Sequence, residues 1–423
     1  VYFWIHGGSN NFGGCADYNG AGIASRSNMV VVVIQYRLGP FGWFNHPALQ
    51  HGDPEDDSGN FGTLDCIKAL EWVRDNITAF GGDPDNVTVA GESAGAHNTM
   101  SLVISPLASG LFHRAVSERG GMEIVSVEHG IEMANATIDN LLVADGTCAT
   151  LEEAAAYRAG MSDAEIEAYL RAKPGEDILN AQPVGTEETH NAYADGYVIP
   201  GGFVETIESG DYNRVPIILG SNEYETKDFI PLFAPLLGKP NWSYVYDLLD
   251  PNFDPTHEWT MGEIFPTAAD SIIYEACGYY GALNWKAHYV DEIARPLQEQ
   301  QDDVYAYRFL WGGPGSGPEP FDFVFGAAHA MEIPFFWGAD ESLFGYSFTE
   351  ENRPGREELQ GDMMAYIANF AATGDPNGSG LYEWEEWSND VGGAKCIQFD
   401  ATYTEADISM MDWEITPTDV VME

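Results

Sequence analysis

The sequence predicts an α/β fold, a mostly parallel central sheet flanked by helices. Residues 29–36 form a continuous apolar run, which is typical of a strand buried on both faces. Residues 64–80 carry apolar side chains at helical spacing, and Gly81-Gly82-Asp83-Pro84 ends that helix. Val87 and Val89 then begin another strand. This strand–helix–strand alternation indicates a parallel sheet.

The length and composition indicate a globular protein with a large core. The chain has 423 residues, of which 44% are hydrophobic and 13% aromatic. No apolar run reaches about 18 residues, so we expect no membrane span. Five scattered cysteines are too few for a disulfide framework, and no C-x-x-C pair or His/Cys cluster indicates a structural metal.

The start of the chain is unusual. Residues 1–5 are typical of a core strand and lack the basic start of a signal peptide. Because a domain seldom begins inside a buried strand, we expect that residues upstream of Val1 are missing. The lack of a visible signal peptide and the odd number of cysteines favour a cytoplasmic location.

Acidic residues dominate the charge. There are 67 Asp and Glu against 18 Lys and Arg, a formal net charge of −49. Such a surface repels nucleic acid and anionic membranes, so we expect neither as a partner. The acids are scattered along the chain, as in a strongly solvated surface. Adaptation to high salt is the sharper hypothesis, because ions screen self-repulsion.

The stretch Gly91-Glu92-Ser93-Ala94-Gly95 joins a predicted strand to a predicted helix. A serine hydroxyl is a poor nucleophile that must be held clear of its backbone, toward a base and a substrate carbonyl. Glycines two residues before and after Ser93 allow the strand and helix to approach closely enough for such a turn. The motif alone is weak, but this context makes Ser93 a candidate nucleophile.

A glycine-rich loop, His6-Gly7-Gly8-Ser9-Asn10, follows the first strand. It lacks both the Lys-Ser/Thr of a phosphate-binding P-loop and the G-x-G-x-x-G spacing of a dinucleotide site. We therefore favour an oxyanion loop, in which backbone N–H groups point into the site.

Several runs together resemble the type-B carboxylesterase family, which includes the cholinesterases. They are Ser58-Gly59-Asn60-Phe61-Gly62, Trp72-Val73-Arg74-Asp75-Asn76-Ile77, Phe80-Gly81-Gly82-Asp83-Pro84 and Gly91-Glu92-Ser93-Ala94-Gly95. The resemblance is dense over residues 1–120 and implies an α/β-hydrolase fold. We expect the family's strands ahead of the glycine-rich loop to be absent here. The implied activity is hydrolysis of small to medium uncharged carboxylic esters, without a cofactor.

The resemblance also implies the triad partners of Ser93. The acid in register after the strand at residues 215–220 is Glu225, with Glu223 as the fallback, although either could be a solvated loop carboxylate. His329 matches the family's catalytic histidine and completes the serine, acid, histidine order of α/β hydrolases. We expect His6 and His97 to be packing or hydrogen-bonding residues.

By the same resemblance, the backbone N–H groups of Gly8, Ser9 and Ala94 form the oxyanion hole. Gly7, Glu92 and Arg119 are supporting residues. Two positions depart from the family. Ser9 stands where a third glycine is usual, and Arg119 replaces the serine of a Gln-Ser-Gly turn that supports the triad. Arg119 could pair with Glu225 or point elsewhere.

We expect one α/β-hydrolase domain over residues 1–423 with two helical additions. Residues 122–200 are predicted to form an insertion near the site, with helices at 124–142 and 151–171. Residues 229–300 are predicted to form an aromatic-rich helical subdomain, which the resemblance assigns to the acyl and alcohol pockets.

Two alternatives to an esterase stay open. Some relatives of the family are catalytically inactive binding proteins, although these typically lack the nucleophile or the base. A hydrolase that prefers amides, lactones or carbamates has the same triad, because pocket shape makes that choice.

High-salt adaptation predicts that the melting temperature rises between low and molar salt, because screening reduces repulsion among the acidic side chains. Thermal unfolding at both ionic strengths measures this. A melting temperature that stays constant would contradict the hypothesis.

Overall fold

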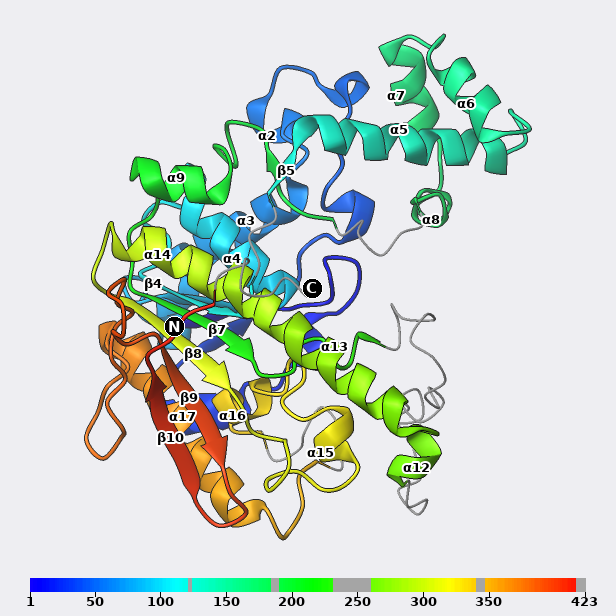
Figure 1. Cartoon of the computed structure of the whole chain (residues 1–423). Coiled ribbons are helices and arrows are strands. Elements are labelled where there is room, and N and C mark those ends of the chain that lie inside the picture. The colour runs from blue at the N-terminus through cyan, green and yellow to red at the C-terminus, as the bar shows by residue number, and fades with distance from the viewer. Residues whose placement is uncertain (121–123, 184–189, 231–259, 340–346, 416–423) are drawn as a thin grey trace.

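A computed structural model describes residues 1–120, 124–183, 190–230, 260–339 and 347–415. Its main strands are β1 (Tyr2–Ile5), β2 (Val31–Val33), β3 (Thr88–Glu92), β4 (Arg114–Glu118), β7 (Ile217–Asn222), β8 (Val304–Phe309), β9 (Cys396–Ala401) and β10 (Ala406–Met411). They form one eight-stranded sheet in the order β10-β9-β8-β7-β4-β3-β1-β2 (Figure 1). Adjacent strands are parallel except β9 and β10. The predicted mostly parallel sheet is confirmed.

The inner strands β1, β3, β7 and β8 are buried on both faces. In β1, Tyr2 and Trp4 join one hydrophobic cluster, whereas Phe3 and Ile5 join another. Successive side chains of a strand point to opposite faces, so a strand buried on both sides favours apolar residues along most of its length. This explains the apolar runs in the sequence. Only residues 31–33 of the predicted 29–36 strand form β2, which lies at the sheet edge and pairs with β1 alone.

Helices cover both faces of the sheet (Figure 1). The face with Phe3 and Ile5 packs against α3 (Phe61–Asn76), α4 (Ala94–Ile104), α9 (Phe203–Ser209) and α14 (Glu292–Gln298). The face with Tyr2 and Trp4 packs against α1 (Ala21–Ser27), α16 (Ile333–Trp337) and α17 (Arg353–Thr373).

Further helices and turns complete the described chain. The other α-helices outside residues 124–183 are α2 (Pro54–Asp57), α12 (Met261–Ile264), α13 (Ala268–Lys286) and α15 (Phe321–Val324). Single 3₁₀ turns lie at Cys15–Asp17, Gly39–Phe41, Pro47–Leu49, Ile77–Phe80 and Pro106–Ala108, and a π turn at Ala287–Asp291. Within the described ranges, no helix combines the length and apolar character needed to cross a bilayer.

Four helices form a group of their own, visible at the upper right of Figure 1. They are α5 (Val127–Ala144), α6 (Leu151–Arg158), α7 (Asp163–Arg171) and α8 (Gly175–Asn180). Their apolar residues form a separate small cluster that includes Leu141 and Leu170. Two short strands, β5 (Val125–Ser126) and β6 (Tyr193–Ala194), pair in parallel and bring together the two ends of this excursion.

The sequence prediction of one helix over residues 151–171 is wrong, because the structure has two. Gly160, a poor helix former, follows α6. Ser162 then begins α7 with a capping box, in which the Ser162 N–H donates to Glu165 Oε2 at 2.8 Å. In the predicted aromatic subdomain at 229–300, residues 231–259 lie outside the described part of the chain.

The sheet brings distant segments to one edge. β1, β3, β4 and β7 are parallel neighbours or next neighbours, so their carboxyl ends meet on the same side. The residues that follow these ends include His6, Ser93, Arg119 and Glu225. Open parallel sheets bind ligands at this edge.

Candidate active site

Ser93 lies at a sharp turn between β3 and α4. β3 ends at Glu92 and α4 begins at Ala94, and Ser93 between them has φ 57° and ψ −126°. A positive φ is strained for a residue other than glycine, and such strain is typical of functional sites. The turn carries the Ser93 side chain away from the regular path of both elements.

The two flanking glycines permit a close backbone approach. A Cβ atom on Gly95 would lie 1.9 Å from the carbonyl oxygen of Ile5, and one on Gly91 would lie 2.4 Å from the Gly95 carbonyl. Side chains at these positions would collide with backbone atoms that cannot move aside. The glycines therefore allow α4 to start directly against the end of β1.

The glycine-rich loop lies beside this turn. A Cβ atom on Gly7 would be 3.1 Å from the Cβ of Ser93, so the loop backbone packs against the nucleophile. Gly8 and Ser9 both have positive φ, of 104° and 52°. Ser9 thus adopts the left-handed conformation that favours glycine, the residue usual in the family. Ala94 is the first residue of α4, where backbone N–H groups lack an intrahelical acceptor.

Asn10 fixes the loop to three other segments. Its side-chain oxygen accepts from Asn98 Nδ2 of α4 at 2.9 Å, and its side-chain nitrogen donates to the His190 carbonyl at 2.6 Å. Its own carbonyl accepts from the Gly39 N–H at 2.6 Å. Asn10 is 1% exposed. Sequence reasoning missed this residue, whose only signal is a polar amide inside a glycine-rich loop.

His6 and His97 pack as expected. The His6 ring is buried and stacks on Tyr36 with ring centres 4.5 Å apart, and its carbonyl accepts from the Tyr36 hydroxyl. Burial, together with the charges of Arg119 and His329, lowers the pKa of His97 to about 3. A ring that stays neutral in this way serves as an uncharged packing group.

Glu225 and His329 are in direct contact. His329 Nδ1 lies 2.9 Å from Glu225 Oε2, and the other carboxylate oxygen of Glu225 accepts from the Asn222 N–H at 2.6 Å. Glu225 is completely buried. The fallback residue, Glu223, faces Arg308 at 3.7 Å instead. The structure therefore places Glu225, and not Glu223, beside the histidine.

Arg119 lies between the serine and the histidine. Its Nη1 atom is 3.4 Å from Ser93 Oγ and 3.1 Å from His329 Nε2. Its Nε atom is 3.5 Å from Glu225 Oε2, so the pairing considered for these two residues is present. Among the described contacts, Ser93 and His329 form no hydrogen bond with each other. The Arg119 guanidinium instead contacts both Ser93 and His329.

Glu92 is a second neighbour of the same histidine nitrogen. Its Oε1 atom lies 2.8 Å from His329 Nε2. Burial raises the pKa of Glu92 to about 8, against the opposing charge of Arg119. Burial and the charge of Arg119 lower the pKa of His329 to about 4, against its contact with Glu225. At neutral pH the imidazole is therefore uncharged, and a protonated Glu92 can donate to Nε2.

Two further features were missed by sequence reasoning. Asn222, at the end of β7, donates its side-chain N–H groups to the Ala328 carbonyl at 2.7 Å and to Glu332. This ties the strand of the acid to the loop of the histidine. Phe229 and Trp285 place their ring centres 5.2 and 6.1 Å from that of His329. In the sequence, these two residues were marked only by lying in an aromatic-rich stretch.

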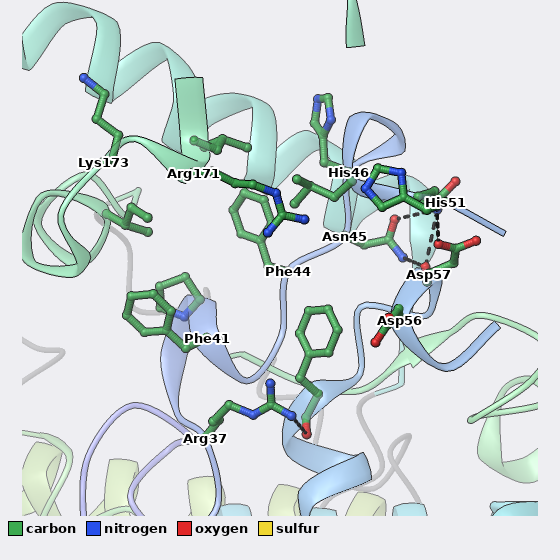
Figure 2. Close-up of a pocket in the computed structure, with 16 residues that line it drawn as sticks. Arg37, Phe41, Phe44, Asn45, His46, His51, Asp56, Asp57, Arg171 and Lys173 are labelled. Atoms are coloured by element: carbon green, nitrogen blue, oxygen red, sulfur yellow. Dashed lines mark hydrogen bonds between the residues drawn. The ribbon is translucent and has the colours of Figure 1, made fainter. Parts of the chain in front are cut away.

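A large cavity lies elsewhere on the molecule. It has a volume of about 780 Å³ and is lined by residues that include Arg37, Phe41, Phe44 and Arg171 (Figure 2). Ser93, Glu225 and His329 do not line it, so it is not the acyl pocket. Within the described residues, no group of three His, Cys, Asp or Glu side chains is arranged to hold a metal ion.

Comparison with known proteins shows the family of the chain. The model of the carboxylesterase family matches residues 1–243 and 270–410. The chain belongs to this family. The chain is 33% identical over 408 residues to Carboxylesterase 1D of Rattus norvegicus, and the alignment covers 93% of this chain and 69% of that protein. Liver carboxylesterase of Sus scrofa is 32% identical over 412 residues, with the same two coverages.

A solved structure gives the same result. The carboxylesterase EST55 of Geobacillus stearothermophilus superposes with a TM-score of 0.67 at 29% identity, over 97% of this chain and 79% of that one. The α/β-hydrolase fold is thereby confirmed. The carboxylesterase is a serine hydrolase of carboxylic esters, as its membership of the family establishes.

We expect Gly95→Ala to reduce the free energy of unfolding by about 2 kcal/mol or more, because the new methyl group collides with the Ile5 carbonyl. Urea denaturation measures the change. Gly361→Ala in α17 is the matched control, since nothing lies within 4 Å of its added Cβ. The control should gain up to about 1 kcal/mol from helix propensity. Equal effects of the two substitutions would contradict the close approach.

Proposed function

We propose that this carboxylesterase hydrolyses small to medium uncharged carboxylic esters through an acyl-enzyme on Ser93. In this proposal His329 is the general base and Glu225 orients it. The observation that carries the proposal is the 2.9 Å contact between His329 Nδ1 and Glu225 Oε2 beside the strained turn of Ser93. The rings of Phe229 and Trp285 next to His329 favour an uncharged substrate.

The first step is acylation. His329 Nε2 takes the proton of Ser93 Oγ while the oxygen attacks the ester carbonyl, and Glu225 stabilises the imidazolium that forms. The tetrahedral intermediate collapses, and the alcohol leaves with the proton from His329. Water then repeats these steps on the acyl-enzyme and releases the acid.

Backbone donors stabilise the negative charge of the intermediate. In the proposed oxyanion hole these are the N–H groups of Gly8, Ser9 and Ala94, with Gly7 keeping the loop against Ser93. One well-placed donor contributes about 3 kcal/mol to the transition state. Glu92 lies against His329, and Arg119 lies against Glu225.

We expect kcat/KM to remain constant from about pH 7 to about pH 5 and to fall as the pH approaches 4. His329 acts as a base only when neutral, and its pKa is lowered from 6.5 to about 4 by burial and by Arg119. Initial rates at low substrate concentration over this range measure the profile. An acid limb with its midpoint near the ordinary histidine value would contradict the assignment.

Ser93→Ala should abolish hydrolysis of p-nitrophenyl acetate and butyrate, with kcat reduced by a factor of about 10⁴ to 10⁶. Without the serine hydroxyl no acyl-enzyme can form, and only substrate binding still contributes to the rate. Absorbance at the p-nitrophenolate band measures the rate. Ser25→Ala on α1, an exposed hydroxyl, is the control and should keep full activity.

A second pair of variants tests the acid. Glu225→Gln should reduce kcat by a factor of about 10² or more, because the imidazolium loses its carboxylate. Glu223→Gln removes the same charge two residues away and should have little effect. Comparable losses in both variants would reject Glu225 as the acid. Turnover that survives in Ser93→Ala, or a parent enzyme inactive on esters but active on amides or lactones, would reject the proposed chemistry.

A further inference from the structure

The guanidinium of Arg119 occupies the path of the proton transfer. It approaches Ser93 Oγ to 3.4 Å and His329 Nε2 to 3.1 Å through the same atom, Nη1. A guanidinium is always protonated and offers only donors, so it cannot accept the serine proton. While it stays there, the hydroxyl faces a cation instead of a base, and Ser93 is not activated.

Several contacts hold the side chain in this place. Its Cζ atom lies 3.3 Å from the centre of the Trp285 ring, a close cation–π contact. Nε lies 3.5 Å from Glu225 Oε2, and the residue is 8% exposed. A buried cation between a carboxylate and an aromatic face is more stable there than a cation left unpaired.

The backbone of Arg119 is also fixed. It has φ 58°, and its N–H donates to the Gly220 carbonyl at 3.0 Å in the neighbouring strand β7. The backbone of Arg119 therefore cannot move away without breaking its hydrogen bond to β7. Only rotation of the long side chain can clear the gap between Ser93 and His329.

We propose that Arg119 is an autoinhibitory latch, whose guanidinium separates nucleophile and base in the resting enzyme and must rotate away before Ser93 can react. The proposal rests on the proposed roles of Ser93 and His329. A latch and a purely supporting residue have opposite effects on the reactivity of Ser93. A residue that only steadies Glu225 makes the serine more reactive, whereas a latch makes it less reactive.

The rate at which diisopropyl fluorophosphate modifies Ser93 shows whether Arg119 raises or lowers the reactivity of this serine. In that reaction Ser93 Oγ forms a bond to phosphorus, the phosphorus–fluorine bond breaks, fluoride leaves and the serine proton passes to His329. If one resting molecule in ten or fewer has the gap open, Arg119→Ser should react at least about 10-fold faster than the parent. Intact-protein mass spectrometry follows the modification.

Arg74→Ser removes an exposed arginine that pairs with Asp75, and this control should react at the parent rate. Arg119→Met removes the guanidinium but keeps an unbranched side chain, so it should also react faster. It decides the question if Arg119→Ser does not fold. Modification of either Arg119 variant at or below the parent rate would overturn the latch and leave the proposed function standing. No modification of any variant would overturn both.

Discussion

The backbone contact between Gly95 and the Ile5 carbonyl determines where chemistry can occur in this protein. Because α4 begins directly against the end of β1, the turn at Ser93 is compressed into a conformation with positive φ. The same contact places the loop after β1 next to the serine, so that Gly7 packs on the Ser93 Cβ. The turn at Ser93 and the placement of the glycine-rich loop are thus two results of one steric requirement.

The second constraint is electrostatic. Glu92, Glu118, Glu225 and Glu332 are all buried at this end of the sheet. Burial raises the pKa of each of these carboxyl groups. Arg119 contacts Glu225, and its charge opposes the rise in the pKa of Glu92, Glu225 and Glu332. The protons held here also mean that the formal charge of −49 overstates the charge that the folded protein carries.

Sequence patterns predicted the sheet and the position of the serine well, because both depend on local rules. Apolar runs require burial on two faces, and G-x-S-x-G requires a tight turn. The choice of Glu225 over Glu223 came from family register, and its contact with His329 depends on Asn222, whose part is visible only in three dimensions.

The placement of Arg119 could not be predicted from its neighbours in sequence. Its side chain is positioned by Trp285, more than a hundred residues later in the chain, and by a backbone conformation that arginine rarely adopts. The break between α6 and α7 was missed for the opposite reason. Apolar spacing continues across it, and only the local signals of Gly160 and Ser162 mark the interruption.

Asn10 has a consequence for how members of this family diverge. Through Asn10, the glycine-rich loop forms hydrogen bonds with α4, with the Gly39 turn and with His190, where the chain returns from the excursion of α5 to α8. Replacing the excursion of α5 to α8 with the equivalent segment of another esterase therefore affects the glycine-rich loop as well. A transplanted segment must also place a carbonyl oxygen where the Asn10 side chain can donate to it. A chimaera without that carbonyl loses a hydrogen bond that holds the glycine-rich loop in place.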